Sequence, residues 1–143
     1  MVPMEAFLST LEQDFPNISF KQGHDFHFHP PTTVFYPNRE LAKYTKNEFK
    51  LLLLHEVGHA ILHHKDYESA VDLLQIEAAA WEEAKKYIKK YHISWDEDFK
   101  DDRLDSYRDY LHKQSSCPRC SLNGYFSTRD SSYHCPNCNY SWH

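Results

Sequence analysis

The most apolar stretch of the chain lies between residues 46 and 62, where hydrophobic side chains recur on almost every side of a predicted helix. Thr45 and Glu48 have the spacing of a capping box, so this helix is expected to begin at about Lys46. Because the helix has no wide polar face, we expect it to be buried inside its domain. Its apolar residues are Phe49, Leu51, Leu52, Leu53, Leu54, Val57, Ala60, Ile61 and Leu62.

The pattern is different before this helix. Residues 5 to 15 have apolar positions at helical spacing and predict a short amphipathic helix. Between residues 18 and 37, apolar and polar residues alternate in three short runs, which Gly23 and the Pro30-Pro31 pair separate. This alternation predicts about three short strands, arranged as an antiparallel sheet. The chain is therefore expected to have an α+β fold, with the sheet leading into the buried helix.

Two more segments follow the buried helix. Apolar residues return at helical spacing from about Asp66 to Tyr91 and predict a second long helix. From Trp95 to Asp109 acidic residues dominate, which is typical of a solvated helix face or a linker, and we assign no chemistry to this run. Apolar residues between Leu104 and Leu111 are expected to dock a short helix on the core.

The buried helix carries the HExxH pattern, His55-Glu56-Val57-Gly58-His59. Two histidines four residues apart project from one helix face, so both imidazoles can bind one zinc ion. Glu56 is displaced round the helix, where its carboxylate can reach a water molecule at the metal and act as general base. Without a metal, either histidine would be a buried polar group in need of a partner. We therefore predict His55 and His59 as zinc ligands and Glu56 as the catalytic residue.

A catalytic zinc usually has three protein ligands, so a third is expected downstream. Glu77 lies in line with Leu73 and Ala80 at steps of three and four residues, which places its carboxylate on an apolar helix face. Glu82 and Glu83 instead align with polar residues and are expected to be solvated or ion-paired. Glu77 is therefore the predicted third ligand. The alternative is a half-buried glutamate paired with a lysine.

Two Cys-Pro-x-Cys motifs lie near the C-terminus, and their thiols belong to Cys117, Cys120, Cys135 and Cys138. This spacing predicts a zinc ribbon, in which four thiolates close a structural zinc site. A segment this short cannot hold a core by apolar burial alone, so the metal is expected to supply its folding free energy. The alternative is a pair of disulfides. We predict a metal-binding catalytic domain of residues 1–112 and a zinc ribbon of residues 113–143.

The ribbon is rich in aromatic residues, and two arginines accompany them: Tyr125, Phe126, Tyr133, Tyr140 and Trp142, with Arg119 and Arg129. These side chains could form a stacking surface for single-stranded nucleic acid, or they could pack the small ribbon. We expect packing for most of them, and the docking of a partner or substrate as the role of the module.

Composition limits the other possibilities. With 143 residues, of which 41% are hydrophobic, the chain is long enough for one core and a small added module. A net charge of −5 argues against nucleic-acid binding over the whole surface, although a local site in the ribbon stays open. The sequence has no run of about 18 apolar residues and no basic-then-apolar leader, so we expect a cytoplasmic protein without a membrane segment.

Other histidines and tyrosines leave alternatives. His27 and His29 would share one face of a strand, and a polar strand face explains them better than a second metal site. Tyr36 and Tyr67 are both candidates to donate a hydrogen bond to a developing oxyanion, and the sequence does not choose between them. If the outer strand of the sheet flanks the cleft, its free backbone groups are expected to pair with an extended peptide.

The stretch from His55 to His63 resembles the HELGHxLLH segment of the ImmA/IrrE-like metallopeptidases, and Glu77-Ala78-Ala79-Ala80-Trp81 is similar to the helix that follows it in that family. The second segment also resembles gluzincins in general, in which ExxA supplies the third zinc ligand. The resemblance implies a zincin-like domain with zinc at His55, His59 and Glu77, catalysis by Glu56, and a protein substrate such as a transcriptional repressor.

The cysteine-rich tail is similar to that of SprT-like proteins, which pair HExxH with a zinc ribbon and act on DNA-associated proteins. The later histidine that those proteins use has no clear equivalent in this sequence.

These residues predict a zinc-dependent peptidase with one catalytic and one structural zinc. Zinc is expected to polarise a water molecule and the scissile carbonyl, while Glu56 takes the proton of the water and passes it to the leaving amine. The competing hypothesis is a non-catalytic adaptor, in which the metal only braces the helices and the ribbon binds nucleic acid or protein. A Glu56→Gln variant separates the two, because only an enzyme would keep its zinc and lose turnover.

Overall fold

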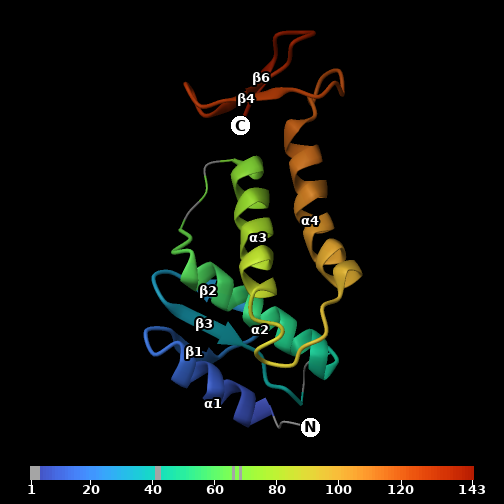
Figure 1. Cartoon of the computed structure of the whole chain (residues 1–143). Helices are drawn as coiled ribbons and strands as arrows, with labels where there is room; N and C mark the ends of the chain where they lie inside the picture. The colour runs from blue at the N-terminus through green and yellow to red at the C-terminus, as the bar shows by residue number, and fades with distance from the viewer. Residues whose placement is uncertain (1–3, 41–42, 66, 68) are drawn as a thin grey trace.

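The secondary structure falls into a larger and a smaller group of elements (Figure 1). The computed structural model describes residues 4–40, 43–65, 67 and 69–143. The larger group contains, in order, α1 (Met4–Asp14), β1 (Ser19–Gln22), β2 (His27–His29), β3 (Thr33–Tyr36), α2 (Lys46–Ile61), α3 (Ala70–Lys85) and α4 (Glu97–Ser115). The smaller group is a C-terminal sheet of β4 (Tyr125–Ser127), β5 (Ser132–His134) and β6 (Ser141–Trp142). This arrangement confirms the α+β class.

Helix α2 runs through the hydrophobic core and begins with the predicted capping box. The Thr45 side chain accepts a hydrogen bond from the backbone N–H of Glu48 (3.1 Å), and the Glu48 carboxylate accepts one from the backbone N–H of Thr45 (3.0 Å). Every residue from Leu51 to Ala60 is buried, as the apolar circumference predicts. The core around it includes Phe7, Leu11, Val34, Trp81 and Leu104.

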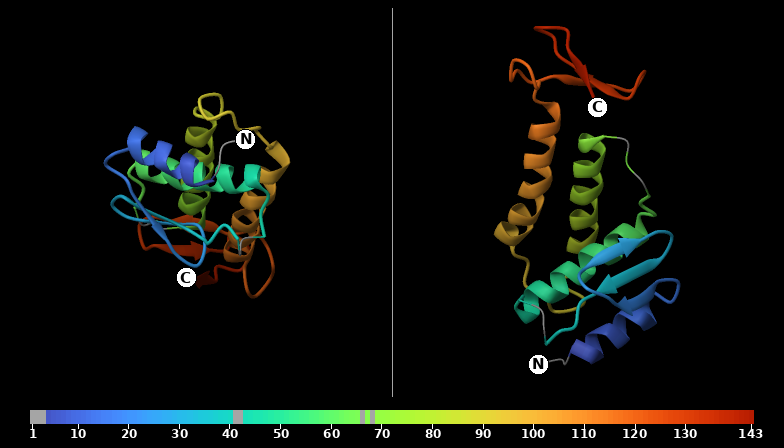
Figure 2. Two further views of the ribbon diagram at one scale, coloured as in Figure 1. Left: turned by 90° about the horizontal axis from the view of Figure 1, so that it is seen from below. Right: turned by 180° about the vertical axis from the view of Figure 1, so that it is seen from behind.

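The first sheet is mixed, so the prediction of an antiparallel sheet is wrong for one of its two pairings. The strand order is β1–β3–β2, with β3 parallel to β1 and antiparallel to β2. Phe20, Val34 and Phe28 lie side by side in this register and pack against the core that α1 and α2 cover (Figure 2). The order therefore places β3, which carries the buried Val34, in the middle. Alternation along each strand does not specify this order, and β2 becomes an edge strand.

Helix α3 is shorter than predicted. Ser69 caps its start, and the predicted start at Asp66 lies outside the described residues. At the other end, residues 86–92 form turns instead of continuing the helix. Apolar spacing persists through these turns because Tyr91 packs edge-on against Phe7 of α1. Periodicity alone therefore extends the helix too far.

The acidic run of residues 95–109 belongs mostly to the long helix α4. It packs beside α3 and buries Leu104, while most of its acidic residues are exposed (Figure 1). Because α4 continues to Ser115, it passes through the predicted boundary between residues 112 and 113, and that division stays a prediction. Among the described residues, no helix has the length and apolar character needed to cross a membrane.

The C-terminal sheet rests on the ends of α3 and α4. Its strands pair antiparallel in the order β4–β5–β6. The indole N–H of Trp142 donates to the carbonyl of Gln114 in the last turn of α4 (2.6 Å). The hydroxyl of the buried Tyr133 lies beside the backbone of Ala70 at the start of α3. The small sheet is thus tied to both helices.

Candidate functional site

Helices α2 and α3 cross at the HExxH segment, and a glycine permits their close approach. A β-carbon built on Gly58 would lie 2.5 Å from the backbone oxygen of Ala80, closer than atoms tolerate. The crossing brings Glu77, which precedes Ala80 by about one turn, against His55 and His59 on either side of Gly58. The three predicted ligands therefore meet from two neighbouring helices.

The predicted ligand atoms form a small buried triangle. Oε2 of Glu77 lies 3.0 Å from Nε2 of His55 and 2.6 Å from Nε2 of His59, and the two nitrogens are 3.2 Å apart. Tetrahedral zinc with ligands at about 2.0–2.1 Å holds neighbouring ligand atoms roughly 3.3 Å apart. Two sides of the triangle are close to that size, and the side between Glu77 and His59 would have to lengthen by about 0.7 Å. Donor types and geometry both fit a metal ion.

The protonation states of these residues also suit a metal. Burial lowers the pKa of His55 to about 4, so its imidazole is neutral at pH 7. Burial raises the pKa of Glu77, but hydrogen bonds with His55 and His59 outweigh this effect and hold the pKa well below its ordinary value. Neutral imidazole and ionised carboxylate are the forms that donate lone pairs to zinc.

Neighbouring rings hold the two imidazoles in place. Trp81 stacks on His55 with ring centroids 4.4 Å apart, and Phe28 of β2 stacks on His59 at 5.9 Å. His64, just beyond α2, places its Nδ1 2.9 Å from Nδ1 of His59. A hydrogen bond at this nitrogen fixes the ring and leaves Nε2 directed at the triangle. Nδ1 of His55 has no such partner among the described residues.

Glu56 faces a cleft beside the triangle. It is only 9% exposed, and it lines a cleft of about 430 Å³ together with His59, Glu77 and the edge strand β2. Burial raises the pKa of Glu56 to about 7, although the neighbouring His59 acts in the opposite direction. A carboxylate with a pKa near neutrality can both take up and return a proton. A larger hollow, of about 620 Å³ near His24 and Lys43, is lined by none of these groups.

Tyr107 of α4 belongs to the cleft, and the sequence analysis did not assign it there. Its hydroxyl lies beside the Glu77 carboxylate. Burial and the charge of Glu77 raise the pKa of Tyr107, so the hydroxyl stays protonated and can donate a hydrogen bond. The only sequence signal is the helical spacing of Leu104, Tyr107 and Leu111. That spacing identifies an inward face but not what the face meets.

The other candidates separate in the structure. Tyr67 lines the cleft, whereas Tyr36 does not. His27 and His29 are exposed on β2 at the edge of the cleft, in agreement with a polar strand face. Within the described part of the chain, two groups of side chains could hold a metal, and neither includes these two histidines.

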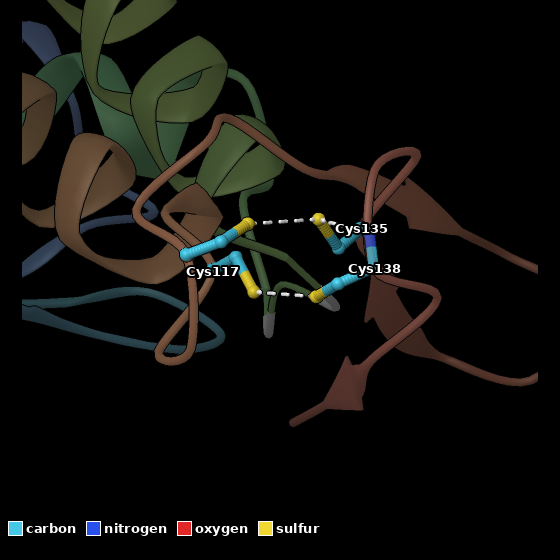
Figure 3. Close-up of side chains that lie close together, drawn as sticks. Cys117, Cys135 and Cys138 are labelled. Atoms are coloured by element: carbon cyan, nitrogen blue, oxygen red, sulfur yellow. Dashed lines mark hydrogen bonds between the residues drawn. The ribbon is translucent and has the colours of Figure 1, made fainter.

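The four cysteines form the second of these groups (Figure 3). Cys117, after α4, points towards Cys138, after β5, with 3.6 Å between the sulfur atoms. The sulfur atoms of Cys120 and Cys135 are 3.4 Å apart, and none of the four cysteines is in a disulfide. Sulfur ligands at about 2.3 Å from tetrahedral zinc lie roughly 3.8 Å apart, so the cluster has nearly the size of such a site.

Both Cys-Pro-x-Cys segments fold in the same way. The backbone N–H of Ser121 donates to the carbonyl of Cys117 (2.9 Å), and that of Asn139 donates to the carbonyl of Cys135 (3.1 Å). Ser121 and Asn139 adopt positive φ angles of 67° and 63°. Hydrogen bonds from the backbone N–H groups of Cys138 and Asn137 lower the pKa of Cys135 to about 6. The backbone N–H of Tyr140 lowers the pKa of Cys138, but burial and the neighbouring thiols outweigh it and raise this pKa to about 11. The turn therefore favours the thiolate at Cys135, the form that a metal binds.

Comparison of the chain with protein-family models, curated proteins and solved structures finds no match.

Proposed function

We propose that the chain is a zinc-dependent peptidase that hydrolyses a protein substrate. The observation that supports this most strongly is the buried triangle of His55, His59 and Glu77 beside a cleft that also contains Glu56. A metal that only braced two helices would need neither an accessible cleft nor a carboxylate poised to accept a proton. Three protein ligands with an open side are typical of catalytic zinc.

Several residues of the cleft have roles in this proposal. His55, His59 and Glu77 would hold a zinc ion, which would supply Lewis-acid chemistry towards a water molecule and the scissile carbonyl. Glu56 takes the proton of the attacking water and delivers it to the leaving amine. The Tyr107 hydroxyl donates a hydrogen bond to the carbonyl oxygen as negative charge develops there, with Tyr67 as the second candidate. His64 keeps the His59 imidazole in its orientation.

The edge strand suits an extended substrate. β2 has β3 on one side only, and its residues line the cleft. The backbone groups on its free side can therefore pair with a peptide that lies along the cleft.

The cysteine cluster is, in this proposal, a structural zinc ribbon that docks the substrate or a partner. Four thiolates leave no position for a reacting group. The HExxH and Glu77 segments resemble the ImmA/IrrE-like metallopeptidases, and SprT-like proteins are the second choice. These resemblances suggest a transcriptional repressor or a DNA-associated protein as the substrate, and nucleic acid as a possible partner of the ribbon.

The test compares Glu56→Gln with the wild type on a fluorescence-quenched unfolded protein. Glutamine keeps the size of Glu56 but cannot accept the proton, so turnover should fall by about 100-fold or more while the zinc content stays unchanged. Metal analysis of Glu77→Ala should show zinc falling from about two equivalents per chain to about one, because the triangle loses a ligand.

Glu82→Gln is the matched control, since Glu82 is an exposed carboxylate on α3. It should retain both zinc and turnover. Equal turnover in Glu56→Gln and wild type would contradict the peptidase proposal. A wild type that binds zinc but cleaves nothing would favour the adaptor.

A further inference from the structure

A second hollow adjoins the catalytic cleft at Glu56. Its volume is about 250 Å³, and Phe26, Glu56 and Tyr107 line both hollows. A peptide bond placed beside Glu56 therefore has room for the chain on either side of it. Each hollow can then select the residues that flank the bond.

The two hollows differ in chemistry. The larger one combines apolar side chains, among them Leu73 and Ile76 of α3, with histidines and Lys65. The smaller one is walled by polar residues of α4, namely Asp102, Arg103 and Ser106. The smaller hollow is therefore the more polar of the two, and its cation is an arginine.

Arg103 influences Glu56 through its charge at longer range but has no carboxylate as a direct partner in the part of the chain that the structure describes. Lys100 and Arg108, on the same helix, form ion pairs with Glu97 and Asp105. For Arg103, by contrast, no carboxylate of the described residues lies within ion-pair distance.

Arg103 is nevertheless held in position by an uncharged partner. Its Nη1 donates to the hydroxyl of Tyr44 (3.2 Å), and its guanidinium carbon lies 5.8 Å from the centre of the Tyr44 ring. Tyr44 in turn packs against Phe26 and Phe99. A guanidinium fixed by an aromatic side chain keeps its remaining N–H donors free for an anion.

We propose that the smaller hollow binds one carboxylate of the peptide substrate through Arg103, which makes this residue a determinant of specificity. The inference rests on the proposed peptidase function and names the substrate class: peptides with an acidic group at a fixed distance from the scissile bond. Guanidinium and carboxylate match in a two-point hydrogen-bonded pair. The carboxylate belongs either to an Asp or Glu side chain or to the C-terminus of the peptide.

Asp102 sets the size of the expected effect. Its carboxylate shares the wall with Arg103 and repels a second negative charge. We therefore expect a preference of about tenfold for an acidic over a neutral substrate, at the low end for a charge-assisted hydrogen bond.

The experiment uses short synthetic peptides built around a bond that the wild type cleaves. Glu replaces Gln at each flanking position in turn, and kcat/KM is measured for each pair. One position should show about a tenfold preference for Glu. The ratio of kcat/KM for the Glu peptide to that for the Gln peptide should fall close to one in Arg103→Gln and to an intermediate value in Arg103→Lys. Arg103→Glu should prefer a peptide with Lys at the selected position. Asp102→Asn should increase the preference for Glu.

Peptides that end at the selected position, with a free or an amidated terminus, separate the two sources of the carboxylate. If a free terminus raises kcat/KM as much as Glu does, Arg103 binds the C-terminal carboxylate of the peptide. If the free and amidated peptides have equal kcat/KM, Arg103 binds an Asp or Glu side chain. Equal cleavage of all acidic and neutral peptides by the wild type would overturn the proposal, as would a Glu preference that survives in Arg103→Gln.

If the wild type cleaves no peptide, the peptidase proposal fails but the role of Arg103 is still tested. For this case, one peptide sequence is made with Glu or Gln at each position in turn, and affinities are measured by fluorescence anisotropy. At one position the affinity should be higher for Glu than for Gln in the wild type and equal in Arg103→Gln. Equal affinities in the wild type would overturn the assignment.

Discussion

At the residue scale, the two cysteine turns contain a matched pair of strained positions. Ser121 and Asn139 follow the second cysteine of each turn with φ angles of 67° and 63°. This region costs a residue with a β-carbon about 1–2 kcal/mol, and asparagine tolerates it better than serine does. We predict that Ser121→Gly raises the free energy of unfolding by about 0.5–1 kcal/mol and that Asn139→Gly gains less. Thermal unfolding followed by circular dichroism measures both changes.

Ser116→Gly provides the control, because Ser116 has an ordinary φ of −84°. Glycine there adds freedom to the unfolded chain and removes the hydrogen bond from the Ser116 hydroxyl to the carbonyl of His112, so stability should fall. A gain in Ser116→Gly equal to that in Ser121→Gly would show that backbone strain is not the cause.

At the scale of elements, the crossing of α2 and α3 decides whether the ligand triangle forms. Ala normally stabilises a helix interior by about 0.5–1 kcal/mol relative to Gly. At Gly58, however, the added β-carbon would meet the backbone oxygen of Ala80 at 2.5 Å, and backbone cannot move aside as a flexible side chain can. We predict that Gly58→Ala lowers the stability by about 1–3 kcal/mol and weakens zinc binding, because the helices must separate.

Urea unfolding and competition with a zinc chelator measure the two effects of Gly58→Ala. Ala79→Gly, a half-buried position on α3, tests helix propensity alone and should cost only about 1 kcal/mol with unchanged zinc affinity. A Gly58→Ala variant that is more stable than the wild type would show that the crossing is looser than described.

Features that depend on local sequence patterns could be predicted from the sequence, and features that depend on tertiary packing could not. The capping box at Thr45 and the four-residue spacing of His55 and His59 act within one helix, so the sequence alone identified both. Glu77 was found because its apolar helix face implied a buried carboxylate. The pairing of β1 with β3 joins segments whose order no local pattern specifies.

Tyr107 and Arg103 show the same limit for the site. Both lie in the run to which the sequence analysis assigned no chemistry, since many acidic neighbours give it the character of a solvated helix face. Their importance depends on α4 packing beside α3, so that one turn of α4 reaches Glu56 from a distant part of the chain. Spacing along a helix cannot contain this information.

At the scale of the whole molecule, the two candidate metal clusters lie in different parts of the fold. Glu77 lies within α3, while the cysteines belong to the segments around the C-terminal sheet (Figure 1). The larger part has an apolar core of its own around α2, whereas the small sheet buries few residues apart from Tyr133 and two cysteines. The larger part should therefore survive loss of the cysteine cluster, but the sheet should not.

Replacing Cys135 and Cys138 by serine tests this asymmetry. We predict that the variant loses about one zinc equivalent and that backbone amides of residues 117–143 lose their protection from hydrogen exchange, because the metal supplies most of the folding free energy there. Amides of α2 should stay protected, and zinc at His55, His59 and Glu77 should remain. The docking of Trp142 and Tyr133 on α4 and α3 should weaken, which lowers the unfolding temperature modestly.

Asn137→Ser changes the same turn without removing a thiol and should match the wild type in hydrogen exchange and zinc content. If protection in α2 were lost together with the sheet, the chain would fold as one cooperative unit, and the boundary predicted between residues 112 and 113 would have no energetic meaning.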